Sequence, residues 1–145
     1  MDWQPNFPTL MGSNGSNTYG VRVQRASYAD KCIDTGWITL SLYNGFSHAS
    51  NALAIRRVGN VVYMQGQIYR ATPPAALAGF TTIPSGYRPT KHVSFMAAMT
   101  ADNLNWAGAD IGVGTDGSAA VGLVGIPTQN NAYWGINTSW VTDYA

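Results

Sequence analysis

The sequence has no glutamate and only two lysines, and charged residues make up 10% of its 145 positions. The formal net charge is +1. Such a chain has no cluster of positive side chains that could follow a phosphate backbone, which argues against nucleic acid as a partner. Good helix formers are scarce, and sixteen glycines and seven prolines interrupt the chain. This composition predicts an all-β protein.

Cysteine and long apolar runs are also scarce. Cys32 is the single cysteine, so an internal disulfide is excluded, and its neighbours lack metal-ligand spacing. We interpret Cys32 as an inert buried thiol, and we expect neither a metal nor a cofactor. No apolar run approaches the roughly 20 residues of a membrane-spanning helix, and the N-terminus has no signal-peptide pattern. We therefore expect no membrane insertion and no export.

Aromatic residues, in contrast, are plentiful. The chain has five Trp, eight Tyr and four Phe. So many large apolar groups, combined with so little charge, leave more apolar surface than a small monomer hides easily. This balance predicts a homo-oligomer.

The pattern along the chain divides it into two parts. Residues 1–33 begin with Pro, Gly, Ser and Asn in no regular period, and they are interpreted as an extended arm or neck. From residue 34 to residue 145, short alternating segments are separated by turn residues, and no helical pattern of useful length occurs. This second part predicts an antiparallel β-sandwich or barrel-like domain.

Two hairpins can be predicted in detail. Gly59-Asn60 is suited to a tight turn, and pairing Val58 with Val61 places Ile55 opposite Met64 and Leu53 opposite Gly66 on a core face. Arg56 and Tyr63 then share the other face.

The second hairpin is predicted to turn at Asp116-Gly117. That turn places Ile111, Val113, Ala120 and Gly122 on one face, and Gly112, Gly114, Ala119, Val121 and Leu123 on the other. Neither face is polar, so both need covering, by a second sheet or by another subunit.

Four motifs stand in a fixed order in this chain: GWITLSLYNGF, LAIRRVGNVVYMQGQI, TIPSGYRP and IGVGTDGSAAV. In this order, over residues 34 to 125, they resemble the C-terminal head domain of tailed-bacteriophage tail fibre and receptor-binding proteins. The preceding YGVRVQRASYADK is similar to the neck that leads into such heads.

This resemblance implies a homotrimer at the tail tip of the virion, assembled in the host cytoplasm. It also implies contact with other tail or baseplate proteins through the N-terminal side, and adhesion to a bacterial surface glycan. A structural cap or trimerisation module without its own receptor site is the alternative. Neither role requires an enzyme.

The TIPSGYRP motif is interpreted as a structural corner. Pro84 and Pro89 restrict the backbone, Gly86 allows a positive φ, and Tyr87 can lie on the sheet while Arg88 reaches an acid or a carbonyl.

Catalytic patterns are weak. His48 and His92 are the two histidines, and neither stands in a nucleophile signature. Asp116 is explained by its turn and Asp110 by a strand start, which leaves Asp102 without a carboxylate partner for glycoside cleavage. We therefore predict a protein that is not an enzyme.

Two segments combine amides with aromatic rings, as a saccharide site requires. Sugar C–H faces stack on aromatic rings, and sugar hydroxyls pair with amide and carboxylate groups. The predicted ligand-binding residues are Asp102, Asn103, Asn105 and Trp106 in the first segment, and Asn131, Tyr133 and Trp134 in the second. A peptide or protein receptor fits such loops as well. Trp37 and Trp140, which lie in alternating segments, are assigned to packing.

Overall fold

The computed structural model describes residues 33–74, 77–101, 106–122 and 130–143. Within these ranges the secondary structure consists of antiparallel strands and contains no helix. The strands belong to one compact unit that begins at Asp34. They are β1 (Ile38–Thr39), β2 (Phe46–His48), β3 (Ala54–Val58), β4 (Val61–Arg70), β5 (Ala78–Thr82), β6 (Val93–Thr100), β7 (Trp106–Val113), β8 (Ser118–Val121) and β9 (Ala132–Val141).

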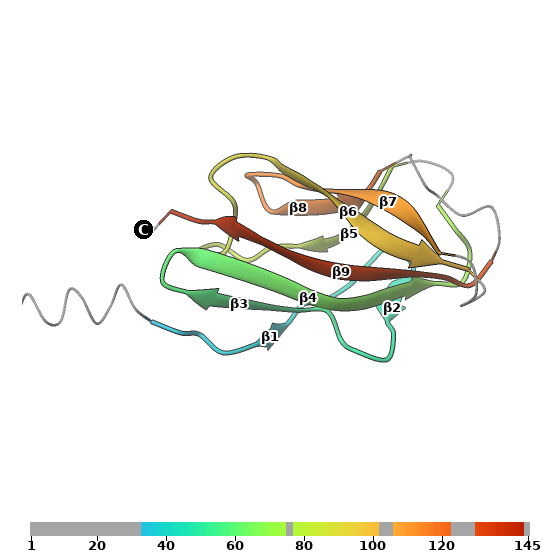
Figure 1. The fold of residues 1–145 in the computed structure, drawn as a ribbon, viewed down its shortest axis with the longest axis horizontal. Helices are drawn as coiled ribbons and strands as arrows, with labels where there is room; N and C mark the ends of the chain where they lie inside the picture. The colour runs from blue at the N-terminus through green and yellow to red at the C-terminus, as the bar shows by residue number, and fades with distance from the viewer. Residues whose placement is uncertain (1–32, 75–76, 102–105, 123–129, 144–145) are drawn as a thin grey trace, which may run out of the picture. The chain divides into compact units, whose positions relative to one another are not determined.

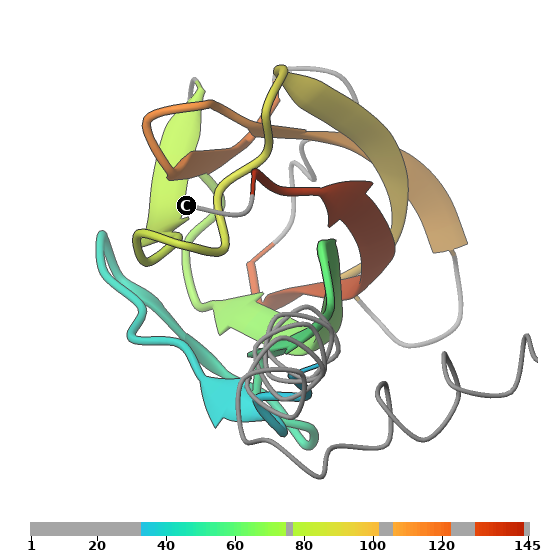
Figure 2. The same ribbon diagram turned by 90° about the vertical axis from the view of Figure 1, so that its left-hand side faces the viewer.

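All of these strands form one continuous sheet. Its order is β1-β3-β4-β9-β6-β7-β8-β5, and β2 pairs with β4 beyond the end of β3 (Figure 1). The sheet curls, as Figure 2 shows, until the segment after β1 meets β5. There Leu42 bridges Thr81, and the Tyr43 N–H donates to the Phe80 carbonyl at 3.1 Å. The all-β antiparallel prediction is confirmed, in its barrel-like form.

The core fills the concave inside of this sheet, because apolar residues alternate along the longest strands. In β4 the buried members include Val62, Met64 and Ile68, and in β9 they are Ala132, Trp134, Ile136 and Trp140. Since side chains on a strand point alternately to opposite faces, the residues between them form the outer face. Trp140 donates its indole N–H to the Tyr87 carbonyl at 2.7 Å, so its assignment to packing is confirmed.

The predicted β3–β4 hairpin is confirmed. Val58 pairs with Val61, Arg56 with Tyr63 and Ile55 with Met64. Gly59 has a φ of 61°, as a tight turn of this kind requires.

The predicted register of the β7–β8 hairpin is wrong by one residue. Ile111 pairs with Val121 and Val113 with Ala119, so all four side chains lie on the core face. The reason is a longer loop: Gly114 and Ser118 close it, and Gly117 has a φ of 92°. A three-residue loop with its last residue in the left-handed region replaces the two-residue turn, and a slip of one residue exchanges the faces.

The corner interpretation of TIPSGYRP is confirmed. The Tyr87 N–H donates to the Pro84 carbonyl at 3.1 Å, and Gly86 between them has a φ of 86°. Arg88 donates its Nε–H to the Ile83 carbonyl at 3.0 Å. The segment therefore joins β5 to β6 through a turn with positive φ at its third position.

Cys32, which the sequence analysis interprets as an inert buried thiol, lies outside the described residues.

Candidate functional site

The predicted ligand-binding residues fall into three groups. Asp102, Asn103 and Asn105 lie outside the described residues. Trp106, Asn131 and Tyr133 reach the outer face or its border, whereas Trp134 does not.

The prediction that Trp134 binds the ligand is wrong. Its exposed fraction is 0%, and its ring packs against Phe46 with 5.6 Å between the centroids. Trp134 occupies the same face of β9 as Ile136 and Trp140, which are also buried. It is a core residue, so no ligand can stack on it.

An aromatic row crosses the outer face where β4 and β6 end. Trp106 pairs with Thr100, Thr100 pairs with Tyr133, and Tyr133 pairs with Tyr69. Paired residues of neighbouring strands point to the same face, so these four side chains form one line across β7, β6, β9 and β4. Trp106 is 56% exposed, whereas Thr100 between the aromatic residues is small and buried. We call these four residues the aromatic row.

One end of the row is held in place by short contacts. The Tyr69 and Tyr133 rings lie 4.9 Å apart between centroids, at an interplanar angle of 44°. The Tyr69 hydroxyl donates to Asn131 Oδ1 at 2.7 Å, and the Asn131 N–H donates to the Ala71 carbonyl at 2.8 Å. Asn131 has a φ of 62°, which asparagine tolerates better than most residues. Two tyrosine rings and an amide are therefore preorganised together.

The outer face continues from the aromatic row toward the turn between β3 and β4. A hollow of about 490 Å³ opens over β4 and β9 and extends to Trp37. Its lining residues are Trp37, Asn51, Ala52, Ala54, Gln65, Gly66, Gln67, Gly135, Ile136 and Asn137. We call this hollow the Trp37 groove.

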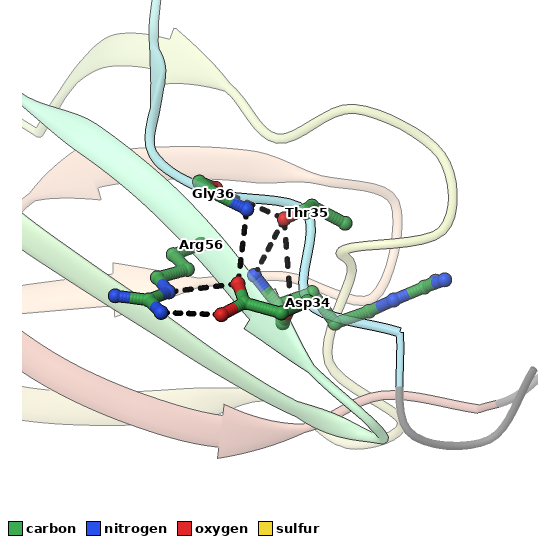
Figure 3. A network of polar contacts seen from close by, with 5 residues as sticks. Asp34, Thr35, Gly36 and Arg56 are labelled. Atoms are coloured by element: carbon green, nitrogen blue, oxygen red, sulfur yellow. Dashed lines mark hydrogen bonds and ion pairs between the residues drawn. The ribbon is translucent and has the colours of Figure 1, made fainter. Parts of the chain in front are cut away.

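Trp37 is 47% exposed, so its assignment to packing is wrong. The Arg56 guanidinium lies 5.9 Å from the centre of its ring, within reach of a cation–π contact. Arg56 in turn donates to both carboxylate oxygens of Asp34, with 2.8 Å between Nε and Oδ1 (Figure 3). The Gly36 N–H also donates to Asp34 Oδ1, at 2.9 Å. This network supports the ring at one side of the groove.

The network lowers the pKa of the Asp34 carboxyl from its ordinary value of 3.8 to about 2. The hydrogen bond from Arg56 is the main cause, and that from the Gly36 N–H comes second. Since the folded-state pKa is depressed, the stabilisation from this pair is present above about pH 4. It is lost as the pH falls toward 2.

We expect an NMR titration of the Asp34 carboxyl to show a midpoint near pH 2. In Arg56→Gln the midpoint should move back toward 3.8, because the main hydrogen bond is lost while the one from Gly36 persists. A wild-type midpoint at the ordinary value would show that the pair does not form in solution.

The histidines have structural contacts. His48 Nδ1 accepts the Leu53 N–H at 3.1 Å, and His92 Nε2 lies 3.1 Å from the Ser94 hydroxyl. Within the described residues no carboxylate is hydrogen-bonded to either imidazole, so they contain no Ser-His-acid relay. The same residues contain no group of three or more His, Cys, Asp or Glu that could hold a metal ion. They also contain no helix long and apolar enough to span a membrane.

The comparison with solved structures shows which class of protein shares this fold. The chain is similar to head domains of bacteriophage receptor-binding proteins. One is the head domain of lactococcal phage bIL170, with a TM-score of 0.57 and 16% identity, over 72% of this chain and 96% of that chain. Another is the receptor binding protein gp15 of Listeria phage PSA, with a TM-score of 0.57 and 18% identity, over 92% of this chain and 80% of that chain.

No protein-family model and no curated protein matches the sequence. At identities below 20% the structural likeness establishes the fold. For the fold, the resemblance to phage receptor-binding heads is therefore confirmed.

Sequence reasoning missed Tyr69 and the amides of the groove, although a signal was present. In YMQGQIY, residues 63–69, the first, third, fifth and seventh residues are Tyr, Gln, Gln and Tyr. This alternation of period two places all four on one face of β4. The same rule applied to β9 separates Tyr133 and Asn137 from Trp134.

Proposed function

We propose that this protein is a receptor-binding head of a bacteriophage tail that adheres to a bacterial surface saccharide without catalysis. The observation that carries the proposal is the aromatic row, in which the exposed Trp106 and the half-buried pair Tyr69 and Tyr133 lie on the same face of the sheet. The fold shared with phage receptor-binding heads supports it.

The chemistry of the row suits a sugar. Aromatic rings fixed on strands offer flat apolar area at little entropic cost, and a sugar ring can lay its C–H face on them. Tyr69, Tyr133 and Asn131 add hydroxyl and amide groups that can pair with sugar hydroxyls. The predicted ligand-binding residues Asp102, Asn103 and Asn105 directly precede Trp106 in the sequence, and the proposal keeps them as ligand-binding residues.

The proposed assembly is a homotrimer at the tail tip, joined to other tail or baseplate proteins by the N-terminal arm of residues 1–33. Exposed apolar side chains such as Met96 and Val141 support burial between subunits. Three weak sites in one particle raise the effective concentration of each, so adhesion can be strong although each contact is shallow.

The test is the binding of fluorescently labelled protein to whole cells of candidate bacterial hosts. Trp106→Ala and Tyr133→Ala should each lower the affinity of one site about tenfold, as expected for loss of a central aromatic contact. Combined over three sites, the apparent affinity for cells should fall by about 10²–10³. Leu77→Ala is the matched control, because Leu77 is exposed but lies outside the row.

Light scattering accompanies the binding assay. A particle of three chains of 15.5 kDa is expected for the wild type and for both variants. Trimers that bind no host cell would favour the alternative, a structural cap or trimerisation module. A stable monomer would refute the trimer, and unchanged binding by both variants would remove the aromatic row from the site.

A further inference from the structure

We propose that the Trp37 groove is a second binding site, which takes an uncharged sugar unit of the same receptor. The inference rests on the proposed adhesion function and adds to it a location and a ligand class. The groove and the aromatic row lie on the same outer face, so one extended saccharide can contact both.

An aromatic side chain forms one wall of the groove. Trp37 is 47% exposed, and its ring lies against the guanidinium of Arg56. Arg56 is itself paired with Asp34 (Figure 3). A half-exposed indole that is held by its neighbours loses little freedom when a ligand stacks on it. Because Arg56 is already paired with Asp34, its charge is largely compensated beside the groove.

Amide side chains form the polar part of the lining. The amides of Gln65 and Asn137 hydrogen-bond each other at 3.1 Å, which leaves one amide oxygen and one amide N–H₂ without a partner in the described residues. Gln67 and Asn51 line the same hollow with further amides. A sugar hydroxyl both donates and accepts a hydrogen bond, so it matches such a mixed set of groups.

The lining of the groove is uncharged. None of the residues that line the groove is ionisable. An anionic ligand, such as a phosphate-containing polymer, would be held by Arg or Lys, and none is present in the lining. The lining therefore selects a neutral sugar.

The floor of the groove is formed by Gly135, which has no side chain to fill it. Gly135 occupies the outer face of β9 between Gln67 of β4 and Ala98 of β6. A Cβ added there would meet its nearest atom, the Ala98 carbonyl oxygen, at 3.9 Å, which is an ordinary contact. The φ of Gly135 is not positive, so other residues fit the backbone, and a longer side chain at this position would occupy the groove.

The distance between Trp37 and Tyr69 sets the size of a ligand that stacks on both residues. Arg56, which lies against Trp37, pairs with Tyr63, and Tyr69 of the aromatic row is six residues further along β4. At about 3.3 Å per residue the two ends of the face are about 20 Å apart. A ligand that contacts both is a chain of several sugar units.

The experiment compares wild type, Trp37→Ala, Gly135→Gln, Tyr133→Ala and Leu77→Ala in binding to a bacterial strain that the wild type labels. Trp37→Ala removes the stacking surface and Gly135→Gln fills the floor, so each should lower the affinity about tenfold. Leu77→Ala should bind as wild type does. Because one groove variant removes atoms and the other adds them, a folding defect common to both is not expected.

Salt dependence tests the ligand class. The affinity of the wild type should change less than about twofold between roughly 50 mM and 500 mM NaCl, since screening acts on charged ligands. An affinity that collapses in high salt would overturn the assignment to an uncharged sugar.

Three further outcomes separate the proposals. Groove variants that bind as wild type does, while Tyr133→Ala is impaired, would overturn the second site and leave the adhesion function intact. A Gly135→Gln protein of lower mass in light scattering would show that a second copy of the chain fills the groove, which overturns the sugar. A wild type that labels no strain would refute both proposals.

Discussion

Replacing Trp134 by alanine should lower the free energy of unfolding by about 3–5 kcal/mol, the range for a large aromatic truncated in a core. Trp134 is completely buried on β9, whose neighbours are β4 and β6. Its ring packs against Phe46, and Phe46 packs against Phe80 at 5.9 Å between centroids. The loss would therefore open a cavity between opposite sides of the curled sheet. Chemical denaturation monitored by circular dichroism measures the change.

Trp134→Phe is the matched control. The indole N–H of Trp134 is buried without a hydrogen-bond partner in the described residues, so its removal leaves no group newly unpaired. We expect Trp134→Phe to cost less than half as much as the alanine variant. If Trp134→Ala unfolded like the wild type but failed to bind cells, the assignment of this residue to the core would be refuted.

Replacing Gly66 by alanine should have an effect of similar size, about 3 kcal/mol or more. Gly66 lies in β4 with a φ of 141°, a conformation that residues with a Cβ rarely adopt. An added Cβ would lie 2.5 Å from the Leu53 Cα and 2.6 Å from the Ala52 carbonyl oxygen. Both are backbone atoms, so the segment that leads into β3 would have to move.

Gly135→Ala provides the comparison for Gly66→Ala. Gly135 pairs with Gln67, the neighbour of Gly66 in β4, but a Cβ at Gly135 fits without overlap. Because alanine is less costly to order in a strand than glycine, this variant should be neutral or gain roughly 0.5–1 kcal/mol. Equal thermal stability of Gly66→Ala and wild type would refute the close approach of the Leu53 backbone.

The sequence predicted those parts of the fold in which a turn determines the register. Gly59-Asn60 allows one two-residue hairpin, and the pairs of β3 and β4 follow from it. The dipeptide Asp116-Gly117, in contrast, is compatible with a two-residue loop and with a three-residue loop. The choice of the longer loop depends on contacts outside the loop, because only that register places Ile111, Val113, Ala119 and Val121 together in the core.

The candidate site was predicted only in part, because its residues are brought together by contacts between strands and not by a local sequence pattern. Composition identified Trp106 and Tyr133 as members of polar aromatic segments, but it did not separate Tyr133 from its buried neighbour Trp134. The line from Trp106 to Tyr69 joins four strands, of which only β6 and β7 are neighbours in the chain. Such a row depends on sheet order, which local patterns do not determine. Trp37 was assigned to packing with the rest of its alternating segment, although the alternation places it on the face of Thr39 and not on that of the buried Leu40.

The position of β9 in the sheet also determines the order in which the domain can fold. β9 is the last strand of the described residues, yet it lies between β4 and β6 and pairs with β4 over its whole length. During synthesis the β3–β4 and β6–β7 hairpins can form early, because their contacts are local. β4 and β6 cannot be joined in one sheet until residues 132–141, which form β9 between them, have left the ribosome. A nascent chain therefore exposes the unpaired edge of β4 until β9 has been synthesised, and a product that is stalled or truncated before β9 is prone to aggregation.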